Sequence, residues 1–140
     1  MAARQTGPVS APVPPTTRTG LLVVGHGSRR PEANAVLEAV ADAVAARLPD
    51  YLVRAAFLEI ARPTVGEGFD ALVAAGAGQV VVHPYFLYPG SHTSSDIPGL
   101  LAAAGTRHPG VTWTLTAPLN LDERIVEVVV DRVAAALVAP

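Results

Sequence analysis

The chain has 140 residues, half of them hydrophobic, which is enough for one domain with a buried core. Its 10 basic and 12 acidic residues nearly balance, so the net charge gives no general attraction to nucleic acids or anionic membranes. The chain contains no cysteine, which excludes disulfide bonds, thiolate metal sites and cysteine nucleophiles. Any metal chemistry must therefore use histidine, aspartate or glutamate.

Residues 1–19 contain several prolines and few large apolar side chains. This composition predicts a disordered tail, followed by one folded domain over residues 20–140. Prolines and threonines interrupt the apolar run that a secretory signal needs, and no later run reaches the roughly 18 apolar residues of a membrane span. We therefore expect a cytoplasmic protein without a membrane partner.

The first half of the predicted domain alternates short β-rich runs with longer helical patterns. The run LLVV (21–24) predicts a first strand. Pro31 is expected to open a helix over 31–48, with an apolar stripe formed by Val36, Val40, Val44 and Leu48. A second strand is predicted over 53–58, and a second helix over 64–75, which the sequence AGAG ends.

The second half continues the alternation. We predict strands over 79–86 and 111–117 and helices over 97–104 and 123–137. Four strands alternating with four helices indicate βαβ units, and the continuously apolar first and third strands are typical of a sheet covered on both faces. The predicted fold is a three-layer α/β sandwich with a four-stranded parallel sheet, for which 2-1-3-4 is the common strand order.

Three chemically active side chains follow successive predicted strands. His26 follows the first strand between two glycines, which permit a tight turn and the close approach of a ligand. Glu59 follows the second strand and His92 the third. Ligands of such sheets bind beyond the carboxyl ends of the strands. Because these strands are neighbours in the order 2-1-3-4, we expect the three side chains to converge over one cleft as metal or proton ligands.

Each of these residues also has an ordinary structural explanation. His26 could bond the backbone of its turn, Glu59 could be solvated or cap a helix, and His92 lies in a Gly-Ser loop. Their coincidence at three strand ends favours the functional interpretation. Of the other histidines, His83 is expected to be a core residue and His108 lies in the turn RHPG. Neither is assigned a chemical role.

A family resemblance rests on three segments, which read VVGHGSRRPEAN (23–34), FLEIARPT (57–64) and VVVHPYFLYPGSHTSSDIP (80–98). In this order they resemble the motifs of small CbiX/SirB-type sirohydrochlorin chelatases, a branch of the class II tetrapyrrole chelatases, over residues 21–132. The resemblance implies a lyase that inserts cobalt or ferrous iron, or nickel in some relatives, into sirohydrochlorin for cobalamin or siroheme biosynthesis. It implies no organic cofactor and leaves the metal and the pathway open.

The resemblance implies that His26 and His92 are catalytic and that Glu59 joins them as a metal ligand. The chemistry suits these residue types, because insertion needs exchangeable ligands for the ion and an acceptor for two pyrrole protons. Neutral imidazole binds cobalt, nickel and iron and also accepts protons. We expect both histidines to deliver the metal jointly, with one of them accepting a proton.

Sirohydrochlorin is a flat apolar ring with many carboxylates, so its site needs an apolar wall and donors at the rim. Arg29 and Arg30 are candidate partners for those carboxylates, or else are solvated. Ser94 and Ser95 lie near a predicted helix start, where they could bind an anion or act as a cap. The wall is assigned to three consecutive residues that could equally be core or dimer contacts, namely Phe86, Leu87 and Tyr88.

Only one Gly-His-Gly-Ser motif is found in the chain, whereas larger relatives contain two such units. The resemblance therefore implies a homodimer. Two other functions remain open at this point. A noncatalytic tetrapyrrole- or metal-binding carrier would need the cleft but not both histidines. A histidine-phosphatase-like hydrolase is disfavoured, because Gly25 stands where those enzymes carry an arginine before the reactive histidine.

Overall fold

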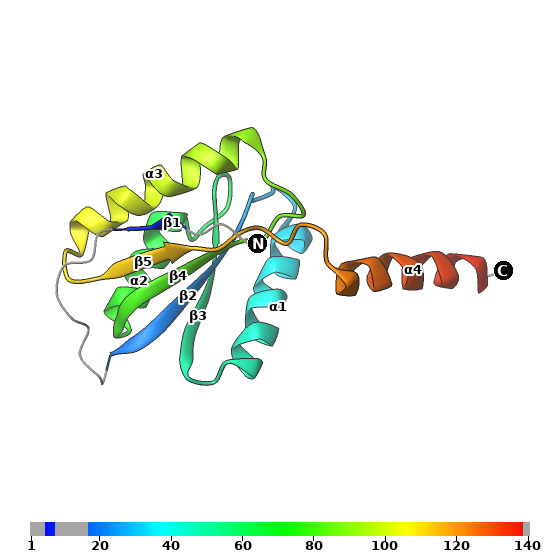
Figure 1. Ribbon diagram of the computed structural model, residues 1–140, viewed down its shortest axis with the longest axis horizontal. Coiled ribbons are helices and arrows are strands. Elements are labelled where there is room, and N and C mark those ends of the chain that lie inside the picture. Colours follow the sequence, from blue (N-terminus) through cyan, green and yellow to red (C-terminus); the bar gives the residue numbers. More distant parts are fainter. Residues whose placement is uncertain (1–4, 8–16, 139–140) are drawn as a thin grey trace.

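The computed structural model describes residues 5–7 and 17–138, without the side chains of residues 5, 6 and 91–95. In chain order the elements are β1 (Gln5–Thr6), β2 (Arg18–Gly25), α1 (Pro31–Arg47), β3 (Tyr51–Phe57), α2 (Val65–Ala74), β4 (Ala77–Pro84), α3 (Ser91–Arg107), β5 (Thr112–Leu115) and α4 (Glu123–Val138). The sheet order is β1-β5-β4-β2-β3, with helices on both faces (Figure 1). The four longer strands are parallel, which confirms the predicted fold and the order 2-1-3-4.

The predicted elements are all present, with shifted ends. The largest shift is in α3, which begins at Ser91 instead of the predicted residue 97 and contains Pro98. The polar residues before Ile97 have no apolar periodicity, so the sequence pattern could not place them in the helix. In contrast, α2 ends as predicted, with Ala75 at the C-cap and Gly76 at a φ of +113°.

The N-terminal segment differs from the predicted tail in two places. Strand β1 pairs antiparallel with β5, and the Gly7 N–H donates to the Trp113 carbonyl at 2.9 Å. Strand β2 begins at Arg18, whose guanidinium donates to the Pro49 carbonyl at 3.2 Å. Neither the backbone pairing of β1 nor the contact of the Arg18 side chain leaves an apolar pattern in the sequence. The remainder of the predicted tail, 1–4 and 8–16, lies outside the described residues, so its disorder stays a prediction.

Each face of the sheet has its own core. Helices α2 and α3 cover one face, and their Phe69, Leu72, Ile97 and Leu101 are fully buried against the strands. On the other face, α1 covers β2 and β3. The predicted stripe on this helix is only partly correct. Its buried positions are Leu37 and Ala41, and Val36 is 60% exposed. Adjacent stripes of a helix can both be apolar, so periodicity alone did not show which one faces the sheet.

The last helix is placed differently from the others. Figure 1 shows α4 projecting away from the sandwich beyond β5, and none of its residues is buried. No helix within the described part of the chain is long and apolar enough to cross a membrane.

Candidate active site at the carboxyl ends of the strands

The turn after β2 holds His26 in a fixed backbone geometry. Gly27 has a φ of +94°, and a Cβ added there would lie 1.8 Å from the Glu59 carbonyl oxygen. The Leu58 N–H donates to the Gly25 carbonyl at 2.9 Å, and the Glu59 N–H donates to the His26 carbonyl at 3.0 Å. Glycine is therefore needed at position 27, because the ends of β2 and β3 are in direct backbone contact there.

The His26 side chain is exposed and packs edge to face against Phe86, with ring centroids 4.7 Å apart and an interplanar angle of 68°. Phe86 is held by the backbone on both sides. Its N–H donates to the Pro84 carbonyl at 2.9 Å, and its carbonyl accepts from the Leu119 N–H at 2.8 Å. The segment after β4 thus orients the imidazole and leaves it accessible.

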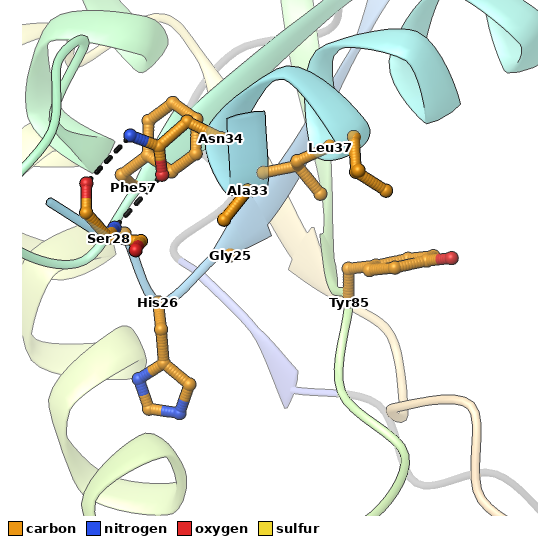
Figure 2. Close-up of a pocket in the computed structure, with 10 residues that line it drawn as sticks. Gly25, His26, Ser28, Ala33, Asn34, Leu37, Phe57 and Tyr85 are labelled. Carbon is orange, nitrogen blue, oxygen red and sulfur yellow. Dashed lines mark hydrogen bonds between the residues drawn. The ribbon is translucent and has the colours of Figure 1, made fainter. Parts of the chain in front are cut away.

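The start of α1 is fixed by one asparagine that the sequence analysis did not single out. The Asn34 side chain accepts from the Ser28 N–H at 2.9 Å and donates to the Ser28 carbonyl at 2.8 Å (Figure 2). The Ser28 hydroxyl in turn accepts from the Arg30 N–H at 3.1 Å. The sequence signal for this contact is an asparagine in the first turn of a predicted helix, because its side-chain amide carries both a donor and an acceptor. These hydrogen bonds set the path of the chain at Arg29 and Arg30, which are both exposed.

A pocket of about 220 Å³ lies beside this turn. In Figure 2 the Leu37 and Ala33 side chains of α1 lie on one side of the pocket and Tyr85 on another, while the His26 ring extends from the turn away from Ser28 and Asn34. The residues that line the pocket are Gly25, His26, Gly27, Ser28, Ala33, Asn34, Val36, Leu37, Phe57 and Tyr85. Tyr85 had not been predicted in the site; its N–H donates to the Val24 carbonyl at 2.8 Å, which places it at the end of β2.

The structure brings some of the predicted site residues together and does not describe others. Glu59 is exposed and its backbone contacts that of His26. His92, Ser94 and Ser95 lie in the first turn of α3, but their side chains are outside the described part of the structure. Their convergence with His26 stays a prediction. Among the described side chains, no three His, Cys, Asp or Glu are grouped so that they could hold a metal ion.

The two histidines without an assigned role make structural contacts. His83 is half-buried, and burial lowers its pKa. Its Nδ1 lies 2.8 Å from the Thr116 Oγ1. His108 follows the end of α3, where its Nε2 lies 2.7 Å from the Asp70 Oδ1. From the sequence, His83 is expected to be a core residue, whereas the structure leaves it half-buried.

Comparison with known proteins identifies the family to which this site belongs. A family model described as CbiX matches residues 20–136. The chain belongs to the CbiX family. It is 39% identical over 114 residues to the chloroplastic sirohydrochlorin ferrochelatase of Arabidopsis thaliana, covering 81% of this chain and 51% of that protein. It is 36% identical over 129 residues to the sirohydrochlorin cobaltochelatase of Methanosarcina barkeri, covering 87% and 99% of the two chains.

The solved structures agree with this CbiX assignment. The sirohydrochlorin chelatase SirB from Bacillus subtilis subspecies spizizenii, in complex with cobalt, is 32% identical and superposes with a TM-score of 0.77 over 84% of this chain and 50% of SirB. The chain thus spans about half the length of the Arabidopsis and Bacillus relatives and nearly all of the Methanosarcina relative. The predicted family and fold are confirmed.

Proposed function

We propose that this CbiX-family chain inserts a divalent metal ion, cobalt or ferrous iron, into sirohydrochlorin. The observation that carries the proposal is the exposed His26 imidazole, oriented by Phe86 at the carboxyl end of β2 and beside an open pocket. Similarity to relatives named as sirohydrochlorin cobaltochelatase and ferrochelatase supports this substrate and these metals. The metal is a substrate in this reaction, and no organic cofactor takes part.

His26 and His92 carry the chemistry in this proposal, and Glu59 is the third metal ligand. The ion must exchange its water for ligands that release it again, while two pyrrole N–H protons leave the macrocycle. Imidazole nitrogens suit both tasks, because the neutral ring binds cobalt or iron and accepts a proton. The exposure of His26 supports this role, since a ligand that hands over its metal must be reachable from the macrocycle plane.

The pocket accommodates part of the macrocycle. Its volume of about 220 Å³ is below the roughly 300–1,000 Å³ of sites that enclose a whole small molecule. One edge of the ring or one substituent therefore enters it, and the rest lies over the exposed strand ends. Arg29 and Arg30 pair with the substrate carboxylates at this rim, and Ser94 and Ser95 supply further donors at the start of α3.

The proposed active form is a cytoplasmic homodimer. Two observations support the dimer. The chain has one Gly-His-Gly-Ser motif, and it matches 50% of the SirB chain, so two copies supply about as much chain as one SirB molecule. Balanced charge and the absence of a membrane-length helix within the described residues are compatible with activity away from membranes.

The test follows the absorbance of sirohydrochlorin during incubation with Co²⁺ or Fe²⁺, at matched substrate occupancy for each variant. His26→Ala should lower the insertion rate by about 100-fold or more, and adding His92→Ala should lower it little further, because residues that act as one unit are not additive. Glu59→Gln should retain more activity, since an amide oxygen can still orient the ion. The control is His108→Ala, which removes a histidine bound to Asp70. A near wild-type rate for His26→Ala would overturn the proposal.

A further inference from the structure

The loop that follows β3, residues 58–63, contains a strained tight turn. The Ala61 N–H donates to the Glu59 carbonyl at 2.7 Å, and Ile60 between them has a φ of +70°. A hydrogen bond from residue i+2 to residue i around a positive φ defines the rare, strained form of the γ-turn. Ile60 therefore lies at the tip of a turn whose backbone is unfavourable for most residues.

Isoleucine is a poor choice for this backbone conformation. Its branched Cβ makes a positive φ a genuine outlier. Among the described residues, the other positions with a positive φ are Gly27, Gly76 and Asn120. Glycine has no Cβ that could clash, and asparagine enters this region several times more often than most residues do. The local backbone alone would therefore favour glycine or asparagine at position 60.

Contacts on either side of the turn hold this conformation. The Glu59 N–H donates to the His26 carbonyl at 3.0 Å, which joins the turn to the end of β2. At the base of the loop, the Phe57 N–H donates to the Pro63 carbonyl at 2.9 Å. Strained residues persist only where the surrounding structure determines their backbone. These hydrogen bonds therefore fix Ile60 beside the turn that carries His26.

The two cores use the flanks of the loop but leave its tip exposed. Leu58 packs against the core on the side of α2 and α3, and Ala61 packs against the core on the side of α1. Ile60, which lies between them, is 60% exposed. A single exposed apolar side chain is normal on a protein surface. On a strained backbone it indicates a function, because neither burial nor local preference accounts for the residue.

The surroundings of Ile60 suit one class of ligand. Glu59, its neighbour in the chain, and His26 are the proposed metal ligands at this edge of the sheet. A tetrapyrrole surrounds its metal with pyrrole rings, so a macrocycle centred on these ligands extends over the residues next to them. Arg29 and Arg30, both exposed, follow His26 in the adjacent turn. An apolar tip beside two cations matches a flat apolar ring that carries carboxylates at its periphery.

We propose that Ile60 is a substrate-binding residue, whose side chain packs on the apolar plane of sirohydrochlorin when the centre of the macrocycle lies over the metal ligands. The inference rests on the proposed function and adds a contact that holds the macrocycle in place. The strained turn fixes the position of the side chain before the substrate arrives, so less conformational freedom is lost on binding. Isoleucine suits this use because its β-branched side chain has few rotamers.

The first experiment measures the equilibrium binding of metal-free sirohydrochlorin through the absorbance of the macrocycle. Ile60→Asn removes the apolar side chain but keeps a residue that tolerates a positive φ. It should raise the dissociation constant by about 10-fold, because the apolar area buried on binding is lost. Ile60→Leu keeps an isomeric apolar side chain and should stay within about 3-fold of the wild type. Leu100→Asn, at a 40% exposed position of α3, is the matched control and should bind like the wild type.

The second experiment measures the thermal stability of the same variants. Ile60→Asn should raise the melting temperature by about 3–6 °C, because it relieves an unfavourable φ. Leu100→Asn should not raise it. Weaker binding together with a more stable fold is the result expected for a residue retained for its ligand. If Ile60→Asn is less stable than the wild type, or if it binds sirohydrochlorin equally well, the inference is overturned.

The insertion assay distinguishes a contact with the macrocycle from a change at Glu59. For Ile60→Asn, the KM for sirohydrochlorin should rise by about 10-fold, whereas kcat at saturating macrocycle and metal should stay within about 3-fold of the wild type. A large fall in kcat with unchanged binding would show that the turn serves to position Glu59. That result would also overturn the inference.

These measurements separate the inference from the proposed function. If the wild type binds sirohydrochlorin more tightly than Ile60→Asn but inserts no metal, the proposed function fails and the contact stands. If the wild type inserts metal and Ile60→Asn binds and inserts equally well, the contact fails and the proposed function stands. A wild type that binds no sirohydrochlorin would overturn both.

Discussion

The two faces of the sheet differ in how completely helices cover them. On the side of α2 and α3, strand residues such as Leu22, Val80 and Val82 are fully enclosed. On the side of α1, the helix contacts β2 and β3, and β4 and β5 present partly exposed threonines and His83. Stability should therefore reside mainly in the closed side, because free energy from burial scales with the apolar area removed from water. The pocket lies on the half-covered side, beside α1.

The largest expected effect comes from the closed side. Leu101→Ala removes a fully buried side chain from α3 and should lower the free energy of unfolding by about 2–5 kcal/mol. Leu100→Ala, at a 40% exposed position of the same helix, and Val36→Ala on the half-covered side should each change it by less than about 0.5 kcal/mol. Urea titration measures all three. Equal losses for Leu101→Ala and Val36→Ala would remove the difference between the two sides.

The turn that leads into α1 is the rigid exception on the half-covered side. Gly27→Ala should lower the free energy of unfolding by about 2 kcal/mol or more, because the new Cβ meets the Glu59 carbonyl at a positive φ. It should also lower the insertion rate, since the contact between the His26 and Glu59 backbones would open. Gly110→Ala is the control, as a Cβ there has no atom within 4 Å. An unchanged melting temperature for Gly27→Ala would show that this turn is not constrained.

The helices of the two sides also begin differently. Helix α2 has a capping box in which Thr64 accepts from the Glu67 N–H at 3.2 Å and the Glu67 carboxylate accepts from the Thr64 N–H at 2.9 Å. Helix α1 begins without a side-chain cap at Arg30. Thr64→Ala should therefore cost about 1 kcal/mol, and Arg30→Ala should leave the melting temperature nearly unchanged. A similar loss for both variants would contradict this comparison.

The smallest effect concerns the protonation of His83 on the half-covered side. Burial lowers its pKa in the folded state, so the unfolded chain binds the proton first as the pH falls. Stability should then decrease from about pH 6.5 downward, toward the folded-state pKa. His83→Gln removes this contribution and should flatten the pH dependence of the urea midpoint between about pH 7.5 and about pH 5.5. Identical slopes for variant and wild type would show that His83 is as solvated in the fold as in the unfolded chain.

Much of the fold follows from local patterns. The continuous apolar runs of β2 and β4 predicted two buried strands, although α1 covers the second face only at β2. Pro31 marked the start of α1, and AGAG marked the end of α2. These signals are local, because a proline restricts the backbone and a glycine allows a positive φ wherever each stands. The same logic placed His26 and Glu59 at strand ends, and the structure brings their backbones into contact.

Other features depended on contacts between distant residues. Periodicity on α1 selected Val36, whereas packing buried Leu37 and Ala41, because the sheet decides which of two apolar stripes it meets. Tyr85 reached the pocket through a backbone bond to Val24, and Asn34 acted through Ser28. Such hydrogen-bond partners cannot be predicted from the residue type and its periodicity alone.

The sequence by itself determined the order of the elements, the side of the sheet where chemistry gathers and the residue types available for it, since these depend on backbone preferences and side-chain chemistry along the chain. Only the tertiary structure decided that the two faces are covered unequally and that α4 leaves the domain with its apolar stripe exposed. The reason is geometric. Coverage depends on the direction in which each connection emerges, and hydrogen bonds such as that from Leu119 to Phe86, distant in sequence, fix that direction.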